Sequence, residues 1–590
     1  MFRSLLVANR GEIALRVMRT AKRMGLRTVA VYSDADRDSP HVRAADAAVH
    51  IGGSAPKDSY LNIDSIIQAA RDSGAEAIHP GYGFLSENEK FSIEVQKTRK
   101  IWIGPPSAAM RAMGDKANAK AIAAKAGVPV LPTYDKDPEF PVLIKAVAGG
   151  GGRGIRLVLS QKYFSENIKI AKSEAEHSFG DSRVMLEKAL LNPRHVEVQV
   201  FADTHGNCIH LGERDCSVQR RHQKLIEESP SPAVGPELRA RMGEAAIKAA
   251  RAVGYVGAGT VEFLFEDGKF WFMEMNTRLQ VEHPVTEALT GFDLVEWLLR
   301  VAAGEPLPVK QEEVRFSGHA IEVRLCAEDP ALDFLPQAGT LALWDPSPDV
   351  RVDHALESGI AIPPFYDSMI AKLIAHAPSR DEARAQLASA LDETIALGIP
   401  TNKAFLAAVL RDEDFGAGRA TTRFLAEKSF PGEKPDFILA ANLLASEHGE
   451  WTGWSNNPSH SARAGFDGQV ISFSVVKEKT KLPHIVDGDT VHFARGGASF
   501  SLRNTLYDPP EKKSTTGKDG RLVAPMNGRV VAVNGKAGDK VDAGKPLVVL
   551  EAMKMEHGLS LSFPVKIKSV HIAAGAQVAP GKLLVEFDPA

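Results

Sequence analysis

The sequence predicts a multidomain protein of mixed class, in which α/β and α+β domains are followed by a small all-β domain. Three observations lead to this fold class. Strands and helices alternate through the first hundred residues, a β-rich stretch with one long helix begins after Gly432, and the last seventy residues contain an internal repeat. At about 150 residues per domain, the 590 residues are enough for about four domains.

The composition excludes several classes of protein. Hydrophobic residues make up 44% of the chain and the formal net charge is −3, which is too apolar and too neutral for a disordered chain. The 71 basic residues are matched by 74 acidic ones, so a basic nucleic-acid binder is not expected. No apolar run approaches the ~20 residues that cross a bilayer, so no membrane segment is expected either.

The cysteines and the first residues favour a reducing, cytoplasmic compartment. Cys208, Cys216 and Cys326 are too few for a disulfide framework, and their spacing matches no zinc pattern. The apolar residues 5–8 run directly into Asn9-Arg10-Gly11-Glu12, which indicates a strand and a turn rather than a signal peptide.

The first elements predict a parallel, doubly wound sheet over residues 1–115. We expect strands at Ser4–Ala8, Thr28–Tyr32 and Ala75–His79, and helices at Ile13–Met24 and Ile63–Ala70. Ligands bind such sheets at the carboxyl ends of the strands, where the turns Asn9–Glu12 and His79–Gly83 fall. The two turns could instead be tight turns with no ligand. A ligand-binding role and a purely structural role therefore both stay open.

A glycine-rich hairpin is predicted after the helix Lys116–Ala126. The strand Pro141–Ala146 leads into the glycines of residues 149–154, and the strand Ile155–Leu159 follows. This order does not fit the dinucleotide fingerprint, which needs a helix after the glycines, and no Walker motif is present. Such a loop can fold over phosphates and offer them backbone N–H groups. A mobile surface hairpin is the alternative.

Charged residues then crowd onto predicted strands. Glu187 and Lys188 end the strand Val184–Lys188, and Arg194–Val200 alternates polar with apolar residues. The charged runs Glu213–Asp215 and Gln219–Lys224 are interrupted by single apolar residues at strand-like spacing. A polar site at a sheet edge is therefore at least as good an explanation as a solvated face.

Two neighbouring strands carry oxygen ligands suited to a metal. Glu262 lies in the strand Thr260–Phe265, and the strand Lys269–Glu274 leads directly to Asn276. Carboxylate and amide oxygens are what Mg²⁺ held jointly by protein and phosphates requires. A purely structural salt-bridge cluster is the alternative.

The rest of the chain reads as further mixed structure and a small β-rich domain. The elements expected are strands at Gly318–Arg324, Gln469–Val476, Thr490–Ala494 and Ala498–Leu502, and helices at Asp381–Leu391, Asn402–Leu410 and Phe437–Ala445. Residues 511–520 contain no apolar side chain and predict a flexible linker.

The last seventy residues contain two copies of one unit. Gly538–Val548 matches Gly575–Val585 at an offset of 37 residues. Two copies of a four-strand unit predict a flattened barrel with quasi-twofold symmetry. Lys554 lies where the first copy hands over to the second, between two methionines at a predicted hairpin tip, and packing does not explain that arrangement.

These motifs resemble those of biotin-dependent carboxylases. Ala552-Met553-Lys554-Met555 resembles the biotin attachment site of carrier domains, and residues 1–447 resemble biotin carboxylase, an ATP-grasp enzyme. The order of the parts is similar to that of α subunits of 3-methylcrotonyl-, geranyl- or propionyl-CoA carboxylases. The resemblance implies a doubly wound domain over 1–115, an ATP-grasp lid over 116–190, the central and C-terminal carboxylase over 191–447, a subunit-contact domain with linker over 448–520, and a flattened β-barrel biotinyl domain over 521–590.

The resemblance also implies a reaction and its cofactors. MgATP activates bicarbonate as carboxyphosphate, and the carboxyl group moves to biotin on Lys554. The nucleotide is expected to contact Lys116, Lys145, Gly150, Gly151, Gly152, Glu187, Lys188, Leu190, His195, Gln219 and His222. Mg²⁺ or Mn²⁺ is expected on Glu262, Glu274 and Asn276. Bicarbonate is expected to contact Lys224, Arg278, Gln280 and Val281, with Glu282 as general base. Arg324 would stabilise the charge that develops on biotin, and Tyr82 would line its pocket.

The partners follow from the same resemblance. The remaining length holds no carboxyltransferase, so a separate β subunit is implied, in a large hetero-oligomer such as an α6β6 assembly, and acyl-CoA would bind through it. A biotin protein ligase would modify Lys554. No nucleic acid and no membrane are expected as partners. A branched enoyl-CoA (3-methylcrotonyl- or geranyl-CoA) is favoured as the acyl-CoA, with propionyl- or acetyl-CoA as the alternative.

Two other functions stay open for comparison. One is another ATP-grasp ligase that joins a carboxylate to an amine, against which the carrier domain argues. The other is a scaffold or sensor with a degenerate nucleotide site, against which the complete set of charged residues argues.

Overall fold

A parallel sheet forms the N-terminal part of the protein. The computed structural model describes all residues except 136, 148–154, 448–460, 467–468, 475–481, 507–519, 553–554 and 590. The sheet has the order β3-β2-β1-β4-β5, all neighbours parallel, with β1 at Ser4–Val7, β2 at Arg27–Ser33, β3 at Ala47–Gly52, β4 at Ala77–His79 and β5 at Ile101–Trp102. Helices α1 (Gly11–Arg23), α3 (Ile63–Asp72) and α4 (Glu89–Lys97) accompany it. The predicted parallel sheet is confirmed.

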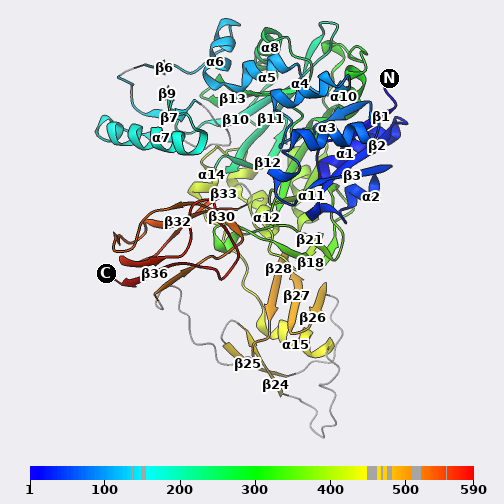
Figure 1. The fold of residues 1–590 in the computed structure, drawn as a ribbon. Coiled ribbons are helices and arrows are strands. Elements are labelled where there is room, and N and C mark those ends of the chain that lie inside the picture. Colours follow the sequence, from blue (N-terminus) through cyan, green and yellow to red (C-terminus); the bar gives the residue numbers. More distant parts are fainter. Residues whose placement is uncertain are drawn as a thin grey trace.

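A small antiparallel sheet projects from this body, beside α7 in Figure 1. Its order is β6-β9-β7-β8, with β6 at Thr133–Tyr134, β9 at Val184–Lys188, β7 at Val142–Ala146 and β8 at Ile155–Val158. Helix α7 (Phe164–Phe179) packs its apolar side chains against Val142, Ile144 and Leu186. Strands β7 and β8 pair antiparallel on either side of the glycine segment, so the predicted strand–loop–strand order is confirmed. Gly150, Gly151 and Gly152 themselves lie outside the described residues.

The largest sheet has eight strands and carries most of the polar residues singled out above. Its order is β14-β13-β10-β11-β12-β15-β22-β20, and all neighbours are antiparallel. The strands are β10 (Arg194–Ala202), β11 (Cys208–Arg220), β12 (Gln223–Ser229), β13 (Gly257–Glu266), β14 (Lys269–Asn276), β15 (His319–Cys326), β20 (Arg351–His354) and β22 (Met369–Ala377). The helices along the two faces are α6 (Lys116–Lys125), α8 (Pro236–Ala252), α9 (His283–Thr290), α11 (Arg380–Glu393) and α12 (Lys403–Arg411). Because these helices cover the sheet, many of its polar side chains are buried, His195, Glu197 and Glu262 among them.

Helix α15 (Phe437–Glu447) packs with the small β-rich unit that follows it. The strands are β24 (Ser461–Phe466), β25 (Gln469–Ser474), β26 (His484–Asp487), β27 (Thr490–Arg495) and β28 (Ala498–Arg503). Ala440 and Leu444 of the helix share one apolar core with Phe466 and Phe493 of the strands. The strands cover one side of the helix, while Ile438 on another side is exposed. The predicted linker at 511–520 lies almost wholly outside the described residues.

The last part of the chain folds into two four-stranded sheets, at the lower left of Figure 1. One sheet has the order β29-β36-β34-β31 and the other β33-β32-β30-β35. The strands are β29 (Arg521–Val523), β30 (Gly528–Val533), β31 (Lys540–Val541), β32 (Pro546–Ala552), β33 (Met555–Ser560), β34 (Val565–Val570), β35 (Gln577–Val578) and β36 (Leu583–Pro589). Each sheet takes two strands from each copy of the repeat, and exchanging the copies converts one order into the other. The predicted quasi-twofold flattened barrel is confirmed.

Candidate active site

Strand β10 positions the first polar residues of the site because its side chains alternate between two faces. Val196, Val198 and Val200 enter an apolar core on one face. His195, Glu197 and Gln199 point to the other face, and all three are buried. Glu197 is opposite Arg214 of β11 on one side and Glu262 of β13 on the other.

The strand register continues this row of charges across the sheet. Glu262 of β13 is in turn opposite Glu274 of β14, so three carboxylates and one guanidinium follow one another on neighbouring strands. His195 Nε2 lies 2.8 Å from Glu262 Oε2, and Asn276 Nδ2 donates to Glu262 Oε1 at 2.8 Å. The predicted metal ligands Glu262, Glu274 and Asn276 therefore belong to one part of the sheet.

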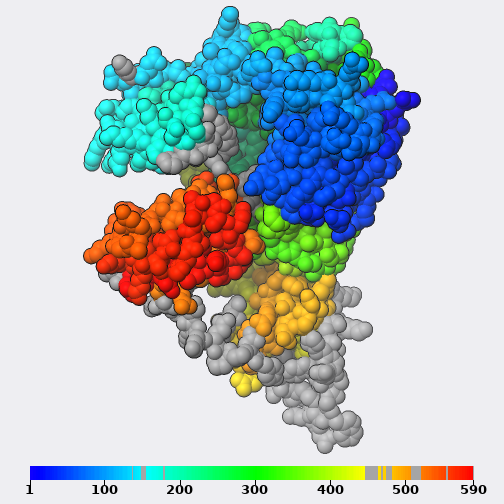
Figure 2. All heavy atoms as spheres, in the orientation of Figure 1, coloured from blue at the N-terminus to red at the C-terminus, as the bar shows by residue number. Residues whose placement is uncertain are grey.

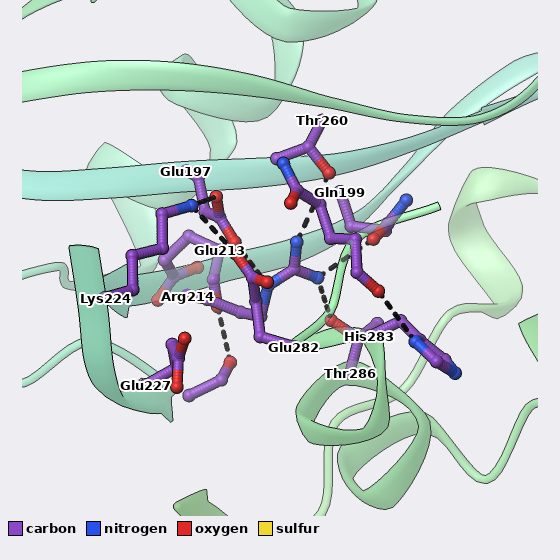
Figure 3. Close-up of polar contacts among 12 residues, drawn as sticks. Glu197, Gln199, Glu213, Arg214, Lys224, Glu227, Thr260, Glu282, His283 and Thr286 are labelled. Atoms are coloured by element: carbon purple, nitrogen blue, oxygen red, sulfur yellow. Dashed lines mark hydrogen bonds and ion pairs between the residues drawn. The ribbon is translucent and has the colours of Figure 1, made fainter. Parts of the chain in front are cut away.

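Lys224 of β12 is held by three carboxylates, two of which, Glu197 and Glu282, are labelled in Figure 3. Its ammonium donates to Glu197 Oε2 at 2.6 Å, and to Glu262 Oε1 and Glu282 Oε1 at 2.8 Å each. Burial lowers the pKa of Lys224, but the three carboxylates outweigh it and raise that pKa well above its usual range. Lys224 is therefore a fixed positive charge.

Arg214 fixes the carboxylate oxygen of Glu197 that does not contact Lys224. Its fully buried guanidinium donates to Glu197 Oε1 at 2.6 Å, to Gln199 Oε1 at 2.9 Å and to Thr286 Oγ1 at 2.8 Å. Glu197 and Arg214 were not among the predicted site residues. Strand alternation from His195 and the charged run at 213–215 were the signals that could have found them.

Glu282 and Arg324 form a second charged pair beside Lys224. Arg324 Nη2 donates to Glu282 Oε2 at 2.9 Å, and Arg324 Nε donates to Glu227 Oε1 at 2.6 Å. Burial raises the pKa of Glu282, but Lys224 and Arg324 outweigh it and hold that pKa well below its usual range. Burial raises the pKa of Glu227 to about 7, against the opposing effect of Arg324. Glu282 is thus ionised before substrate binds, and Glu227 titrates near neutrality.

Arg278 is oriented by a residue that the sequence did not suggest. Its Nε donates to Glu87 Oε2 at 2.9 Å and its Nη1 to Gln280 Oε1 at 2.9 Å. The backbone carbonyl of Val281 accepts from the buried Lys372 at 2.8 Å. Only the position of Glu87 after the turn His79–Gly83 could have pointed to it.

The lid contributes a carboxylate between two lysines. Glu187 of β9 forms ion pairs with Lys145 of β7 and Lys120 of α6. Burial raises the pKa of Glu187, but Lys145 and Lys120 outweigh it and lower that pKa. Lys120 was missed, although it lies one helical turn after Lys116 and so on the same face.

One cavity of about 2880 Å³ brings most predicted residues together. It is lined by Tyr82, Lys116, Lys145, Lys188, Leu190, His195, Gln219, His222, Lys224, Glu262, Glu274, Asn276, Arg278, Gln280, Val281 and Arg324. Figure 2 shows the hollow between the lid, the N-terminal sheet and the C-terminal barrel. Glu187 and Glu282 are not part of the lining but contact residues that are. Lys145 donates to Glu187, and Lys224 donates to Glu282. Lys554 lies outside the described residues, but Ala552, two residues before it, also lines the cavity.

The chemistry of this lining fits the groups that the sequence predicts. Burial and the neighbouring Glu262 both raise the pKa of Glu274, and a divalent cation would relieve that repulsion. Tyr82 Oη and Gln280 Nε2 are buried without a hydrogen-bond partner among the described residues, so two polar atoms are free for a polar ligand.

Family models match four parts of the chain and leave residues 428–519 unmatched. Residues 1–110 match the biotin carboxylase N-terminal domain, 106–310 the ATP binding domain of the carbamoyl-phosphate synthase L chain, and 322–427 the biotin carboxylase C-terminal domain. Residues 520–587 match the domain described as "Biotin-requiring enzyme".

Full-length relatives decide the family. The chain is 43% identical to methylcrotonoyl-CoA carboxylase subunit alpha of Dictyostelium discoideum, over 96% of this chain and 93% of that protein. It is 40% identical to the propionyl-CoA carboxylase alpha chain of Ruegeria pomeroyi, over 100% of both. The chain belongs to the family of biotin-dependent acyl-CoA carboxylase alpha subunits. It is an ATP-dependent biotin carboxylase with its own biotinyl domain.

A solved structure agrees with this membership. The biotin carboxylase domain of 2-oxoglutarate carboxylase from Hydrogenobacter thermophilus, in complex with MgADP and bicarbonate, is 46% identical with a TM-score of 0.70. It covers 72% of this alpha subunit and 98% of its own chain. Among the residues described here, no helix combines the length and apolar character needed to cross a membrane.

Proposed function

We propose that this alpha subunit carboxylates biotin on its own Lys554 with ATP and bicarbonate. The observation that supports it best is the single cavity, which is lined both by Lys224 and Arg324 and by Ala552 of the biotinyl domain. We place the boundaries of its parts at 1–115, 116–190, 191–447, 448–520 and 521–590. Helix α15, at the end of the third part, packs against the strands of the fourth.

The lid and the hairpin of β11 and β12, which contains His222, would hold the nucleotide. Burial lowers the pKa of His222. The nearby positive charges of His195, Lys145 and Lys116 lower this pKa further. This gathers the proposed phosphate ligands on one side of the cavity. Glu262, Glu274 and Asn276 would hold Mg²⁺, which supplies positive charge to the phosphates when it is bound.

The charged groups beside Lys224 would act on bicarbonate. Lys224 and Arg278 supply two fixed cations, and Gln280 orients Arg278 at 2.9 Å. Glu282, ionised and adjacent to Lys224, would take the proton of bicarbonate. Arg324 donates from Nε to Glu227, which fixes its guanidinium. We infer that this guanidinium would stabilise negative charge on the ureido oxygen of biotin.

The second half of the reaction would need a partner. We propose a separate carboxyltransferase β subunit in a hetero-oligomer of α6β6 type, and a branched enoyl-CoA as acceptor, with propionyl- or acetyl-CoA as the alternative. A biotin protein ligase would modify Lys554. The three buried free thiols fit a reducing, cytoplasmic compartment.

Formation of ADP from MgATP tests the proposal directly. We expect purified protein that carries no biotin on Lys554 to form ADP only when both bicarbonate and free biotin are supplied. ADP formation that ignores either compound, or an avidin blot without signal after coexpression with a biotin ligase, would contradict it. Co-purification with the partner and a panel of acyl-CoAs then identifies the acceptor.

A further inference from the structure

One contact between the biotinyl domain and the carboxylase is made by a short loop. This loop, which we name the docking loop (Glu328–Pro336), comprises β16 (Glu328–Asp329), a 3-10 turn and β17 (Leu335–Pro336), which pairs with β16. Leu335 packs against the apolar cluster of the biotinyl domain, the cluster that also contains Ala552. An apolar side chain of the carboxylase thus completes the core of a different domain.

A polar residue of the biotinyl domain faces the same place. His557 of β33 follows Lys554 by three residues. Burial lowers the pKa of His557. The nearby Arg221 and Arg220 lower this pKa further, whereas Asp333 raises it. His557 Nε2 is buried without a hydrogen-bond partner among the described residues. The surroundings of His557 are therefore net positive, with two arginines against one carboxylate.

The docking loop is also fastened to the hairpin that carries site residues. Arg220 Nη2 donates to the carbonyl of Asp333 at 2.5 Å, and its guanidinium lies 4.1 Å from the centre of the Phe334 ring. The hairpin turn beyond Arg220 contains His222, and β12 then leads to Lys224. The loop that contacts the biotinyl domain is thus held in place by the hairpin at the phosphate side of the cavity.

The backbone of both segments supports a functional reason for this contact. Asp333 and Phe334 have φ of 54° and 59°, and Arg221 and His222 have φ of 49° and 65°. Four non-glycine residues in the left-handed region, in two turns that touch each other, carry strain that the surrounding contacts must offset.

We propose that the docking loop, together with the adjacent Arg220 and Arg221, is the surface on which the biotinyl domain of this chain is seated during carboxylation. Leu335 and the two arginines are its recognition elements. The inference rests on the proposed function. It gives Leu335, which is outside the cavity lining, and the two arginines, which line the cavity without a proposed part in the chemistry, a role that only the tethered substrate needs.

The test compares two substrates on one protein. Full-length, biotinylated Leu335→Ser is assayed with free biotin and, separately, for ¹⁴C-bicarbonate incorporated into its own Lys554. We expect free-biotin turnover to stay within twofold of wild type and incorporation to fall about tenfold. Leu332→Ser is the matched control, because Leu332 is 59% exposed on the same loop, and it should change neither rate.

A charge change on the biotinyl side checks the same surface independently. His557→Lys places a cation against the two arginines and should slow incorporation several-fold, whereas His557→Glu should not slow it. Complete biotinylation of each variant is verified by mass. Unchanged incorporation in both Leu335→Ser and His557→Lys, or an equal loss with free biotin, would overturn the proposal. Failure of wild type itself with free biotin would instead refute the proposed function.

Discussion

At the scale of single residues, the site is a chain of alternating charges in which each group fixes the next. Glu227 holds Arg324, Arg324 holds Glu282, and Glu282 holds Lys224. Such buried pairs add little net stability by themselves, but they fix donor and acceptor positions before substrate arrives. Glu227 is the member of this chain that titrates near neutrality, with a pKa of about 7.

We therefore predict that Glu227→Gln acts in a pH-dependent way. Below pH 7 Glu227 is mostly protonated in wild type and resembles glutamine, whereas above pH 7 its charge strengthens the hydrogen bond to Arg324. The ratio of wild-type to variant kcat with free biotin should be close to 1 at pH 6. It should rise to about tenfold at pH 8, since one charge-assisted hydrogen bond is worth about 1.4 kcal/mol. A ratio that stays constant between these pH values would exclude the orienting role.

A companion prediction concerns Arg324 itself. Arg324→Ala should nearly abolish carboxylation of free biotin, because the side chain lines the cavity and no other described cation is held by Glu227. ATP binding, measured by calorimetry, should persist, since the proposed nucleotide ligands are untouched. Normal carboxylation by this variant would remove Arg324 from the mechanism.

At the scale of elements, one carboxylate between two lysines joins three elements of the lid, residues 116–190. Glu187 joins β9 to α6 and β7. Its side chain is 6% exposed, whereas the pair Arg156–Glu174 on the same lid is 31% and 44% exposed. Solvent screening makes the exposed pair weak, whereas removing Glu187 would leave two partly buried lysines without their counter-charge.

Glu187→Gln should therefore loosen the lid. We expect cleavage by trypsin within residues 116–190 to become several-fold faster without nucleotide, and the KM for ATP to rise. Glu174→Gln removes the same charge from an exposed pair and should leave both quantities unchanged. Equal cleavage rates for the two variants would show that Glu187 does not restrain the lid.

At the scale of the whole molecule, the biotinyl barrel acts as a substrate attached to its enzyme. The tether converts an encounter in solution into a high local concentration of biotin at the cavity. The barrel's position at the cavity rim, seen in Figure 2, fits that arrangement.

Lys554→Arg separates the tether from the chemistry. The variant keeps the charge but cannot be biotinylated, so avidin should not retain it and no ¹⁴C should enter the chain. Turnover of free biotin should remain at the wild-type level, because every residue proposed to act in the cavity is unchanged. Incorporation of label into Lys554→Arg would refute the attachment site.

The sequence by itself determined the elements, their class and a set of polar residues most of which line the cavity, since periodicity and local motifs depend on neighbours along the chain. Strand alternation predicted β10 and β13, and the repeat predicted both sheets of the barrel. Only the tertiary structure decided which charges pair. Glu197 meets Lys224 through strand register, Glu87 reaches Arg278 across 191 residues, and Leu335 meets the barrel across two domains. These contacts depend on distances between segments that are remote in sequence, and no local pattern encodes them.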